Sequence, residues 1–179
     1  YEDRWGGEMN WNSNHRGKDS IYGESIYTTR IEIIGTYQLP IKEDLKLSFS
    51  ANSHNQNSVY GDVPYIGKQN IGFGQLVWNK VLTRNDFILG SSYRYTFYDD
   101  NTPATGSISK NNPDINQIAS IFLQDEFTAT EKQKILIGSR LDFSNHHGII
   151  FTPRIGYKIN LKKLHAIRFN AGTGFRVVN

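Results

Sequence analysis

Residues 118–143 show a two-residue alternation of apolar and polar side chains along two arms that flank a short polar segment, residues 128–134. A side-chain period of two is typical of a β-strand, because successive residues point to opposite faces. A short polar link between two such arms predicts an antiparallel turn. The stretch is therefore predicted to be a hairpin with one apolar face and one polar, charged face. In the second arm Ile135, Ile137, Ser139, Leu141 and Phe143 oppose Leu136, Gly138, Arg140 and Asp142.

The same alternation recurs along the chain, and no segment has a convincing helical period. The sequence thus predicts an all-β fold, an antiparallel up-and-down meander of about nine strands joined to their nearest neighbours. The predicted strands are residues 4–11, 24–39, 45–52, 70–79, 87–98, 118–127, 135–143, 151–161 and 166–174.

The predicted connections alternate between short and long. Residues 40–44, 82–86, 128–134 and 162–165 read as turns, whereas residues 12–23, 54–69 and 99–116 are rich in Asn, Ser, Gly, Asp and Pro and read as loops. Short turns at one end and long loops at the other are typical of transmembrane β-barrels. Because a soluble sandwich also has one apolar and one polar face, alternation alone leaves a soluble β-protein open.

Composition narrows the class of protein. Of 179 residues, 37% are hydrophobic and 13% aromatic, and there is no cysteine. No apolar run approaches the about 18 residues of a transmembrane helix. A barrel that alternates lipid-facing and lumen-facing residues has an average hydropathy like that of a soluble protein. The absence of cysteine excludes disulfides and thiolate metal sites. The net charge of +3 includes no concentrated basic stripe, so no nucleic-acid partner is expected.

Catalytic and cofactor motifs are also missing. The five histidines lack helical metal-ligand spacing, and no G-x-S-x-G elbow occurs. Gly172 and Gly174 resemble part of a glycine fingerprint, but no helix is predicted to follow them. We therefore expect no enzyme, no cofactor and no resident metal.

The two faces of the predicted strands give two sets of residues. Charged side chains on the polar face are expected to line a lumen and to pair across strands: Arg30, Glu32, Arg94, Glu126, Arg140, Asp142, Arg154 and Arg168. Apolar side chains on the other face are expected to meet lipid: Tyr27, Ile31, Ile33, Leu47, Phe49, Leu89, Tyr93, Ile135, Ile137, Leu141, Ile155, Ile159, Ile167 and Phe169.

About nine strands in a membrane would leave two sheet edges with unpaired backbone groups. Each such group costs several kcal/mol in lipid. We therefore expect the chain to be a segment of a larger transmembrane β-barrel.

Four segments in the second half of the chain resemble, in order and spacing, the barrel of TonB-dependent outer-membrane receptors, especially those of Bacteroidetes-type bacteria. They are IFLQDEF at Ile121, KILIGSRLDF at Lys134, FTPRIGYKI at Phe151 and IRFNAGTGFRVVN at Ile167. NIGFGQLVW at Asn70 and SSYRYTFYDDNTPAT at Ser91 are similar to the strands and loop that precede that region.

The resemblance implies a bacterial outer-membrane barrel of about 22 strands whose lumen is blocked by a plug. Residues 1–179 would be part of that one barrel domain, without the plug, the TonB-contacting segment or the remaining strands. Its implied partners are outer-membrane lipid, the rest of the barrel and its plug, the TonB complex through the plug, and a small-molecule or glycan ligand. Its implied function is import of a scarce solute such as a siderophore, a corrinoid or a glycan. A soluble all-β ligand-binding protein and a passive porin are the alternatives.

Ligand contact is predicted in two loops, residues 60–65 and 98–102, because loops on a rigid barrel carry recognition. Tyrosine offers a flat apolar surface with a hydroxyl group. The candidates could instead be an aromatic girdle with solvated acids, or carboxylates that hold Ca²⁺. The predicted ligand-binding residues are Tyr60, Asp62, Tyr65, Asp99 and Asp100.

Overall fold

The computed structural model describes residues 1–107, 110–162 and 165–176. It is all-β, with one short 3-10 helix and no α-helix among those residues. The strands are β1 (Glu2–Gly7), β2 (Gly23–Gln38), β3 (Asp44–Tyr60), β4 (Val63–Val81), β5 (Asn85–Asp100), β6 (Gly106–Ser107), β7 (Lys110–Asn111), β8 (Asp114–Thr130), β9 (Gln133–Ser144), β10 (Gly148–Lys162) and β11 (His165–Gly172), and the 3-10 helix is η1 (Ser13–His15).

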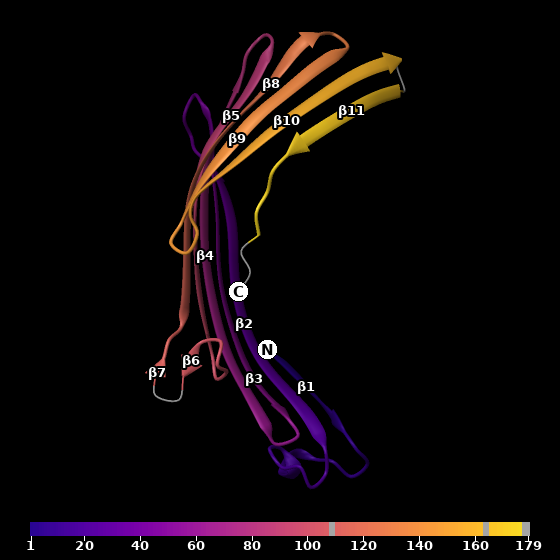
Figure 1. Ribbon diagram of the computed structural model, residues 1–179, viewed down its shortest axis with the longest axis vertical. Helices are drawn as coiled ribbons and strands as arrows, with labels where there is room; N and C mark the ends of the chain where they lie inside the picture. The colour runs from indigo at the N-terminus through magenta and orange to yellow at the C-terminus, as the bar shows by residue number, and fades with distance from the viewer. Residues whose placement is uncertain (108–109, 163–164, 177–179) are drawn as a thin grey trace. The chain divides into compact units, whose positions relative to one another are not determined.

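Nine of these strands form one sheet in the order β1-β2-β3-β4-β5-β8-β9-β10-β11, and β6 pairs with β7 in a small separate ribbon. Sequential strands are neighbours, so the prediction of an antiparallel up-and-down meander of about nine strands is confirmed. In Figure 1, β9, β10 and β11 run side by side. The η1 helix is capped by Asn12, whose side chain accepts a hydrogen bond from the backbone of Asn14.

The chain divides into two units. Unit 1 comprises residues 1–34, 50–73 and 95–116, and unit 2 comprises residues 35–49, 74–94 and 117–179. Unit 1 includes the β1–β2 pairing, in which Gly7 lies opposite Gly23. Trp11 packs against those two glycines, since a Cβ on Gly23 would meet its indole at 2.1 Å. Unit 2 includes the full β8–β9 and β9–β10 registers and the β10–β11 register.

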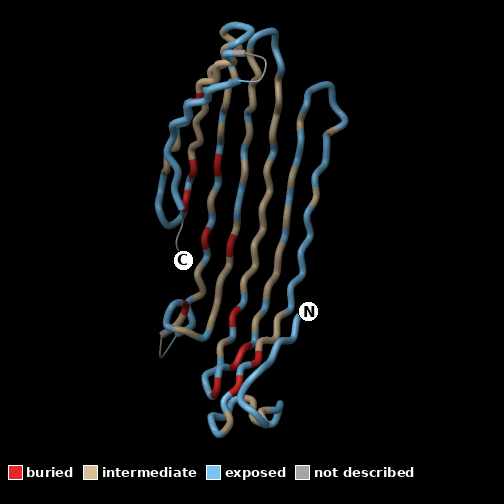
Figure 2. Tube along the Cα trace, turned by 90° about the vertical axis from the view of Figure 1, so that its right-hand side faces the viewer, coloured by how far each residue is buried: buried red, intermediate tan, exposed pale blue. Residues whose placement is uncertain are grey.

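Burial in the described residues is the reverse of that in a soluble domain. Val59, at 6% exposure, is the one buried hydrophobic residue of the described chain, while exposed apolar side chains include Ile31, Ile137 and Phe169 at 64%, 59% and 63%. Figure 2 shows the buried positions scattered along individual strands instead of gathered in a core. The buried polar residues of the described chain are Ser25, Ser58, Thr96, Thr105, Asn116, Ser120, Asp142 and Ser144.

The register explains this reversal in unit 2. Residues directly opposite one another in an antiparallel pair share a face. Ile137 lies opposite Ile155, and Arg140 lies opposite Phe122 and Thr152. The odd-numbered positions of β8 to β11 therefore form an apolar face and the even-numbered positions a largely polar one, as predicted. The apolar face includes Ile121, Leu123, Phe127, Ile135, Ile137, Leu141, Phe151, Ile155, Ile159, Ile167 and Phe169.

The predicted loop at residues 54–69 is wrong. These residues belong to β3 and β4, which turn at Gly61 and Asp62, with Gly61 at a φ of +62°. Ser53 Oγ and Asn70 Oδ1, which are 2.8 Å apart, join the two strands. The segment is polar on both faces, and such a composition is typical of a loop. A strand that extends past the hydrocarbon layer needs no apolar face, since only about 9–11 tilted residues cross it.

Several predicted boundaries also differ from the structure. The first strand ends at Gly7, before Trp11, and the last one ends at Gly172. The predicted loop 99–116 is shorter, because Asp99 and Asp100 still belong to β5 and β8 begins at Asp114. The turn between β8 and β9 is confined to Glu131 and Lys132. Part of the predicted turn at residues 162–165 lies outside the described residues.

Candidate ligand-binding site

The predicted ligand-binding residues Tyr65 and Asp100 are joined through Tyr98. Tyr65 comes from the start of β4, and Tyr98 and Asp100 come from the end of β5. The Tyr65 and Tyr98 hydroxyl oxygens are 2.9 Å apart, and the Tyr98 hydroxyl donates to Asp100 Oδ2 at 2.8 Å. The hydrogen bond with Tyr65, burial and the Asp100 carboxylate together raise the pKa of Tyr98. Tyr98 is therefore held as a neutral phenol between the Tyr65 hydroxyl and the Asp100 carboxylate.

Asp100 also organises the start of the β5–β8 connection. Its Oδ1 accepts hydrogen bonds from the Thr102 backbone at 2.9 Å and from the Thr102 and Thr105 hydroxyls at 2.8 Å. Thr105 is 2% exposed, and its hydroxyl oxygen accepts from the Asp100 backbone N–H at 2.8 Å. Burial raises the pKa of Asp100, but the donors from Thr102, Thr105 and Tyr98 outweigh it and lower that pKa to about 2.

Asn101 fastens this connection to β4. Its side-chain oxygen accepts from the Ile66 backbone at 2.8 Å, its amide donates to the Pro64 carbonyl at 2.9 Å, and its backbone N–H donates to the Ile66 carbonyl at 3.1 Å. We name the set Tyr65, Tyr98, Asp100, Asn101, Thr102 and Thr105 the loop-end network.

The other three predicted site residues do not join the loop-end network through any of these bonds. Asp99 Oδ2 accepts from the Asn111 amide at 3.2 Å, which links β5 to β7. Tyr60 ends β3 with 36% exposure, and Asp62 is exposed in the β3–β4 turn. Tyr98 lies within the predicted loop segment 98–102, but the sequence did not indicate that it joins Tyr65 to Asp100.

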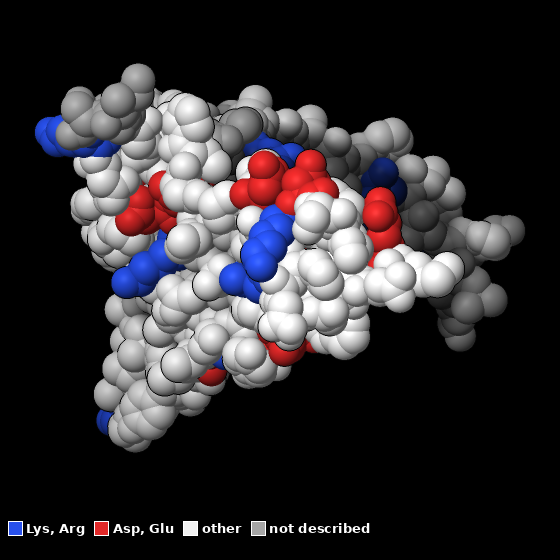
Figure 3. Space-filling view, turned by 90° about the horizontal axis from the view of Figure 1, so that it is seen from below, with Lys and Arg blue, Asp and Glu red and all other residues white. Residues whose placement is uncertain are grey.

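Acidic and basic side chains are mixed on the molecule's surface. In Figure 3 they lie beside one another on the face that is seen. The described residues contain no group of three or more His, Asp or Glu side chains that could hold a metal ion. Asp100, one of the carboxylates considered for Ca²⁺, accepts three hydrogen bonds at Oδ1 and one at Oδ2 within the loop-end network.

A second polar cluster lies on the even-numbered face of β8 and β9. Asp142 is fully buried, and its Oδ1 accepts from Ser120 Oγ at 2.5 Å and from Arg140 Nε at 2.8 Å. Arg140 Nη2 donates to Ser120 Oγ at 2.7 Å and to Ser92 Oγ at 3.3 Å, and its guanidinium lies 5.7 Å from the Phe122 ring centroid. Arg140 and Asp142 lie on the same polar face, as the alternation predicts, but their ion pair runs along β9 and not across strands. Sequence reasoning missed the complete burial of Asp142. We name this set of residues the Arg140–Asp142 cluster.

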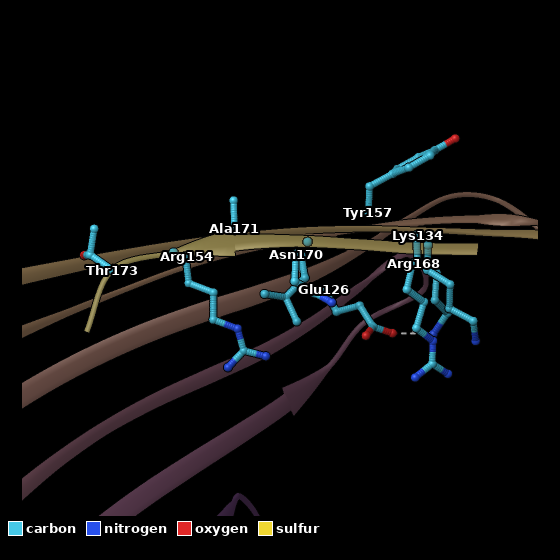
Figure 4. A pocket seen from close by; sticks show the side chains of 12 residues that line it. Glu126, Lys134, Arg154, Tyr157, Arg168, Asn170, Ala171 and Thr173 are labelled. Carbon is cyan, nitrogen blue, oxygen red and sulfur yellow. Dashed lines mark hydrogen bonds and ion pairs between the residues drawn. The ribbon is translucent and has the colours of Figure 1, made fainter. Parts of the chain in front are cut away.

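A hollow of about 610 Å³ lies on unit 2 over β8 to β11. In Figure 4, Glu126, Lys134, Arg154 and Arg168 project to one side of the sheet, while Tyr157 projects to the other. Lys134 forms an ion pair with Glu126. The residues that line the hollow are Glu126, Lys134, Leu136, Arg154, Gly156, Tyr157, Lys158, Arg168, Asn170, Ala171, Gly172 and Thr173.

Sequence reasoning counted three of these residues, Glu126, Arg154 and Arg168, among the lumen charges. It placed Lys158 on the same face as Arg154 without counting it there, and it placed Lys134 in a turn. The missing signal for Lys134 was the register. Lys158 lies directly opposite both Lys134 and Arg168, so an even position in β10 implied even positions on both neighbours.

No helix among the described residues has the length and apolar character needed to cross a bilayer.

A sheet that exposes its apolar side chains on one face and keeps ions and hydrogen-bonded polar groups on the other is the wall of a membrane-embedded β-barrel. The sequence shows which kind: residues 1–178 match the family described as TonB dependent receptor-like, beta-barrel, and the chain belongs to that family. It is an outer-membrane family of receptors and transporters, not a family of enzymes. Neither a curated protein nor a solved structure matched the chain.

Proposed function

We propose that the chain is part of the barrel wall of an active importer in the bacterial outer membrane. It acts with the rest of its barrel, with a plug that closes the lumen, and with an inner-membrane TonB complex that pulls on the plug. The chain itself performs no catalysis. Its apolar face meets lipid, and its polar face lines the path of the solute.

The observation that carries this proposal is the reversed burial. Exposed apolar residues such as Ile137 and Phe169 occupy one face, while Asp142 is completely buried on the other. A soluble β-protein would have its apolar face covered, because exposed apolar surface carries a hydration cost. Lipid removes that cost without any covering layer.

The solute is a scarce compound of the siderophore, corrinoid or glycan class, and we place its first contacts at the loop ends. Tyr60 and Tyr65 offer flat faces with hydroxyl groups, and Asp62, Asp99 and Asp100 offer acceptors for the hydroxyl or ammonium groups of a ligand. The loop-end network supports this placement because it holds Tyr65 and Asp100 in fixed positions.

Cell fractionation and uptake assays on the complete gene product test the proposal. The protein should be found with outer membranes, and uptake of labelled solute should stop when the inner-membrane proton gradient is collapsed. Uptake that continues without that gradient would indicate a passive porin, and a soluble, monodisperse gene product would indicate the soluble alternative. Either result would overturn the proposal.

The loop-end placement has its own test in the complete receptor. Replacement of Tyr60, Tyr65, Asp99 and Asp100 together by Ala should lower affinity for the solute and leave the melting temperature of the barrel close to that of the wild type. The matched control replaces Tyr37 and Asp44 by Ala. Tyr37 is next to the last residue of β2, and Asp44 is the first residue of β3, whereas Tyr60 is the last residue of β3. If affinity is unchanged in the quadruple variant, these residues have no role in recognition.

A further inference from the structure

The hollow on unit 2 holds an excess of positive charge. Four of its lining side chains are cationic, namely Lys134, Arg154, Lys158 and Arg168, and one, Glu126, is anionic. Glu126 is already paired with Lys134. Within the described part of the chain, Arg154, Lys158 and Arg168 form no ion pair.

The register places three of these cations in one transverse row. Lys134 in β9, Lys158 in β10 and Arg168 in β11 are direct cross-strand partners. Side chains that face each other across antiparallel strands have Cβ atoms about 4.5–5.5 Å apart, and like charges there are destabilising. A row of three cations therefore raises the free energy of the sheet unless an anion lies among them.

The next positions along the strands hold two glycines and Asn170. Lys158 is followed on the same face by Gly156 in β10, and Arg168 by Asn170 in β11. Gly156 and Gly172 line the hollow without side chains, and the Asn170 side chain extends over Gly156, where an added Cβ would meet Asn170 Oδ1 at 2.8 Å. Arg154 lies beyond Gly156 on the same strand, opposite Gly172. In Figure 4 the Arg154 and Arg168 side chains leave the same side of the sheet, with Asn170 between them.

We propose that this hollow binds an anionic group, a carboxylate or a phosphate, between Arg154, Lys158 and Arg168. Arginine donates to such oxygens in pairs and lysine supplies a compact charge, so the three side chains match a group with two or three exposed oxygens. The Asn170 amide adds a neutral donor. The anion comes either from a solute in the lumen or from an acidic side chain elsewhere in the complete receptor, and the chemistry of recognition is the same.

This inference rests on the proposed function only in taking the even-numbered face as the lumen. The hollow lies at the end of β8 and β9 that carries their short turn, because Lys134 is only two residues past the turn residue Lys132. It is separate from the predicted ligand-binding residues, all of which belong to unit 1.

The test uses the full-length receptor purified in detergent, with inorganic phosphate as the probe and chloride added to hold ionic strength constant. The melting temperature of the wild type should rise saturably with phosphate. Lys158→Gln and Arg168→Gln should each weaken the apparent phosphate affinity about tenfold, since each removes a charge-assisted hydrogen bond. The control Arg94→Gln removes a cation from β5, which does not line the hollow, and should leave the affinity unchanged.

A charge-reversal variant identifies the source of the anion. Arg168→Glu places a carboxylate opposite Lys158, so without phosphate this variant should melt above the wild type if the hollow is open to solutes. If wild-type receptor ignores phosphate and Arg168→Glu melts below it, while Arg94→Gln does not, an acidic side chain of the receptor occupies the hollow.

The proposal is overturned if phosphate has no effect on wild type and Arg168→Glu leaves the melting temperature unchanged. It is also overturned if phosphate stabilises wild type, Lys158→Gln, Arg168→Gln and Arg94→Gln equally. These readouts do not depend on transport, so an uptake assay that fails would count against the proposed function and not against the anion site.

Discussion

The Arg140–Asp142 cluster and the row of Lys134, Lys158 and Arg168 lie on the same face of the same sheet, yet they treat charge in opposite ways. Asp142 is fully buried, and its Oδ1 is satisfied by Ser120 and Arg140. In the row, by contrast, like charges face each other with one carboxylate, Glu126, nearby. Charge on a barrel's polar face is therefore of two kinds. Consumed charge, such as that of Asp142, is paired within the barrel wall. Available charge, such as that of Lys158, faces like charges and is left to bind a partner.

Breaking the buried pair should have the largest effect. Arg140→Gln removes the only charged partner that the described structure gives to Asp142, which has no access to solvent. Because loss of one member of a buried ion pair leaves an uncompensated charge, we expect a loss of about 3 kcal/mol in the free energy of unfolding. Urea unfolding of the complete receptor in detergent or lipid measures it. Arg94→Gln is the matched control, and equal unfolding curves for the two variants would contradict the role of Arg140.

The opposite face of the same strand provides the next test, because the comparison assumes that even positions face the lumen. Ile137 is 59% exposed on the apolar face, and Gly138 follows it on the polar face. Ile137→Arg should destabilise the assembled barrel by roughly 2–4 kcal/mol, since a cation near the bilayer midplane is costly. At Gly138 an added Cβ would lie 3.4 Å from the Gln124 side chain, so Gly138→Arg should crowd the lumen instead.

A lipid-soluble photolabel distinguishes these two positions directly. With a single cysteine at each position in turn, labelling should be strong at 137 and weak at 138. Equal labelling would show that the register assigned to β9 is wrong, and with it the lumen placement of both charge clusters.

The loop-end network extends the comparison to a carboxylate near solvent, where pH is the lever. The pKa of Asp100 is lowered to about 2 from an ordinary value of 3.8, so the local stability that it gives to the β5–β8 connection is present above pH 3.8 and is lost as pH falls toward 2. Pepsin, which is active across this range, should cleave near Tyr98 more readily at pH 2 than at pH 4. The Asp100→Asn variant should be cleaved equally at pH 2 and pH 4. If wild-type cleavage near Tyr98 does not differ between the two pH values, the anchoring role of Asp100 is contradicted.

The sequence predicted the fold and the face of most charged residues, because alternation is a local property. It placed Arg140 and Asp142 on one face for the same reason, but it did not predict that they pair with each other along β9. It failed at residues 54–69, where β3 and β4 extend as polar strands on which neither face carries an apolar signal.

Register was the second thing that alternation could not provide. A shift of one residue in pairing moves every side chain to the other face, and the turn between β8 and β9 was predicted only as residues 128–134. The structure confines that turn to Glu131 and Lys132. Only with this register known do Lys134 and Lys158 become direct partners, and only then does the positive row become visible. The complete burial of Asp142 likewise depends on Ser120 and Arg140 lying across and along the strands from it.

The smallest expected effect is also the one that separates the two kinds of charge most sharply, because its sign is reversed. Lys158 faces Lys134 on one side and Arg168 on the other, so Lys158→Gln removes two like-charge contacts from the row. In receptor washed free of phosphate and other multivalent anions, this variant should be more stable than the wild type by about 0.2–1 kcal/mol, the range of a cross-strand charge interaction. Added phosphate should then reverse the order, since the wild type alone keeps the full set of cations around the anion. Urea unfolding with and without phosphate measures both signs. If Lys158→Gln is destabilising without phosphate, as Arg140→Gln is expected to be, Lys158 belongs to the wall's own bonding, and the distinction between consumed and available charge fails at this residue.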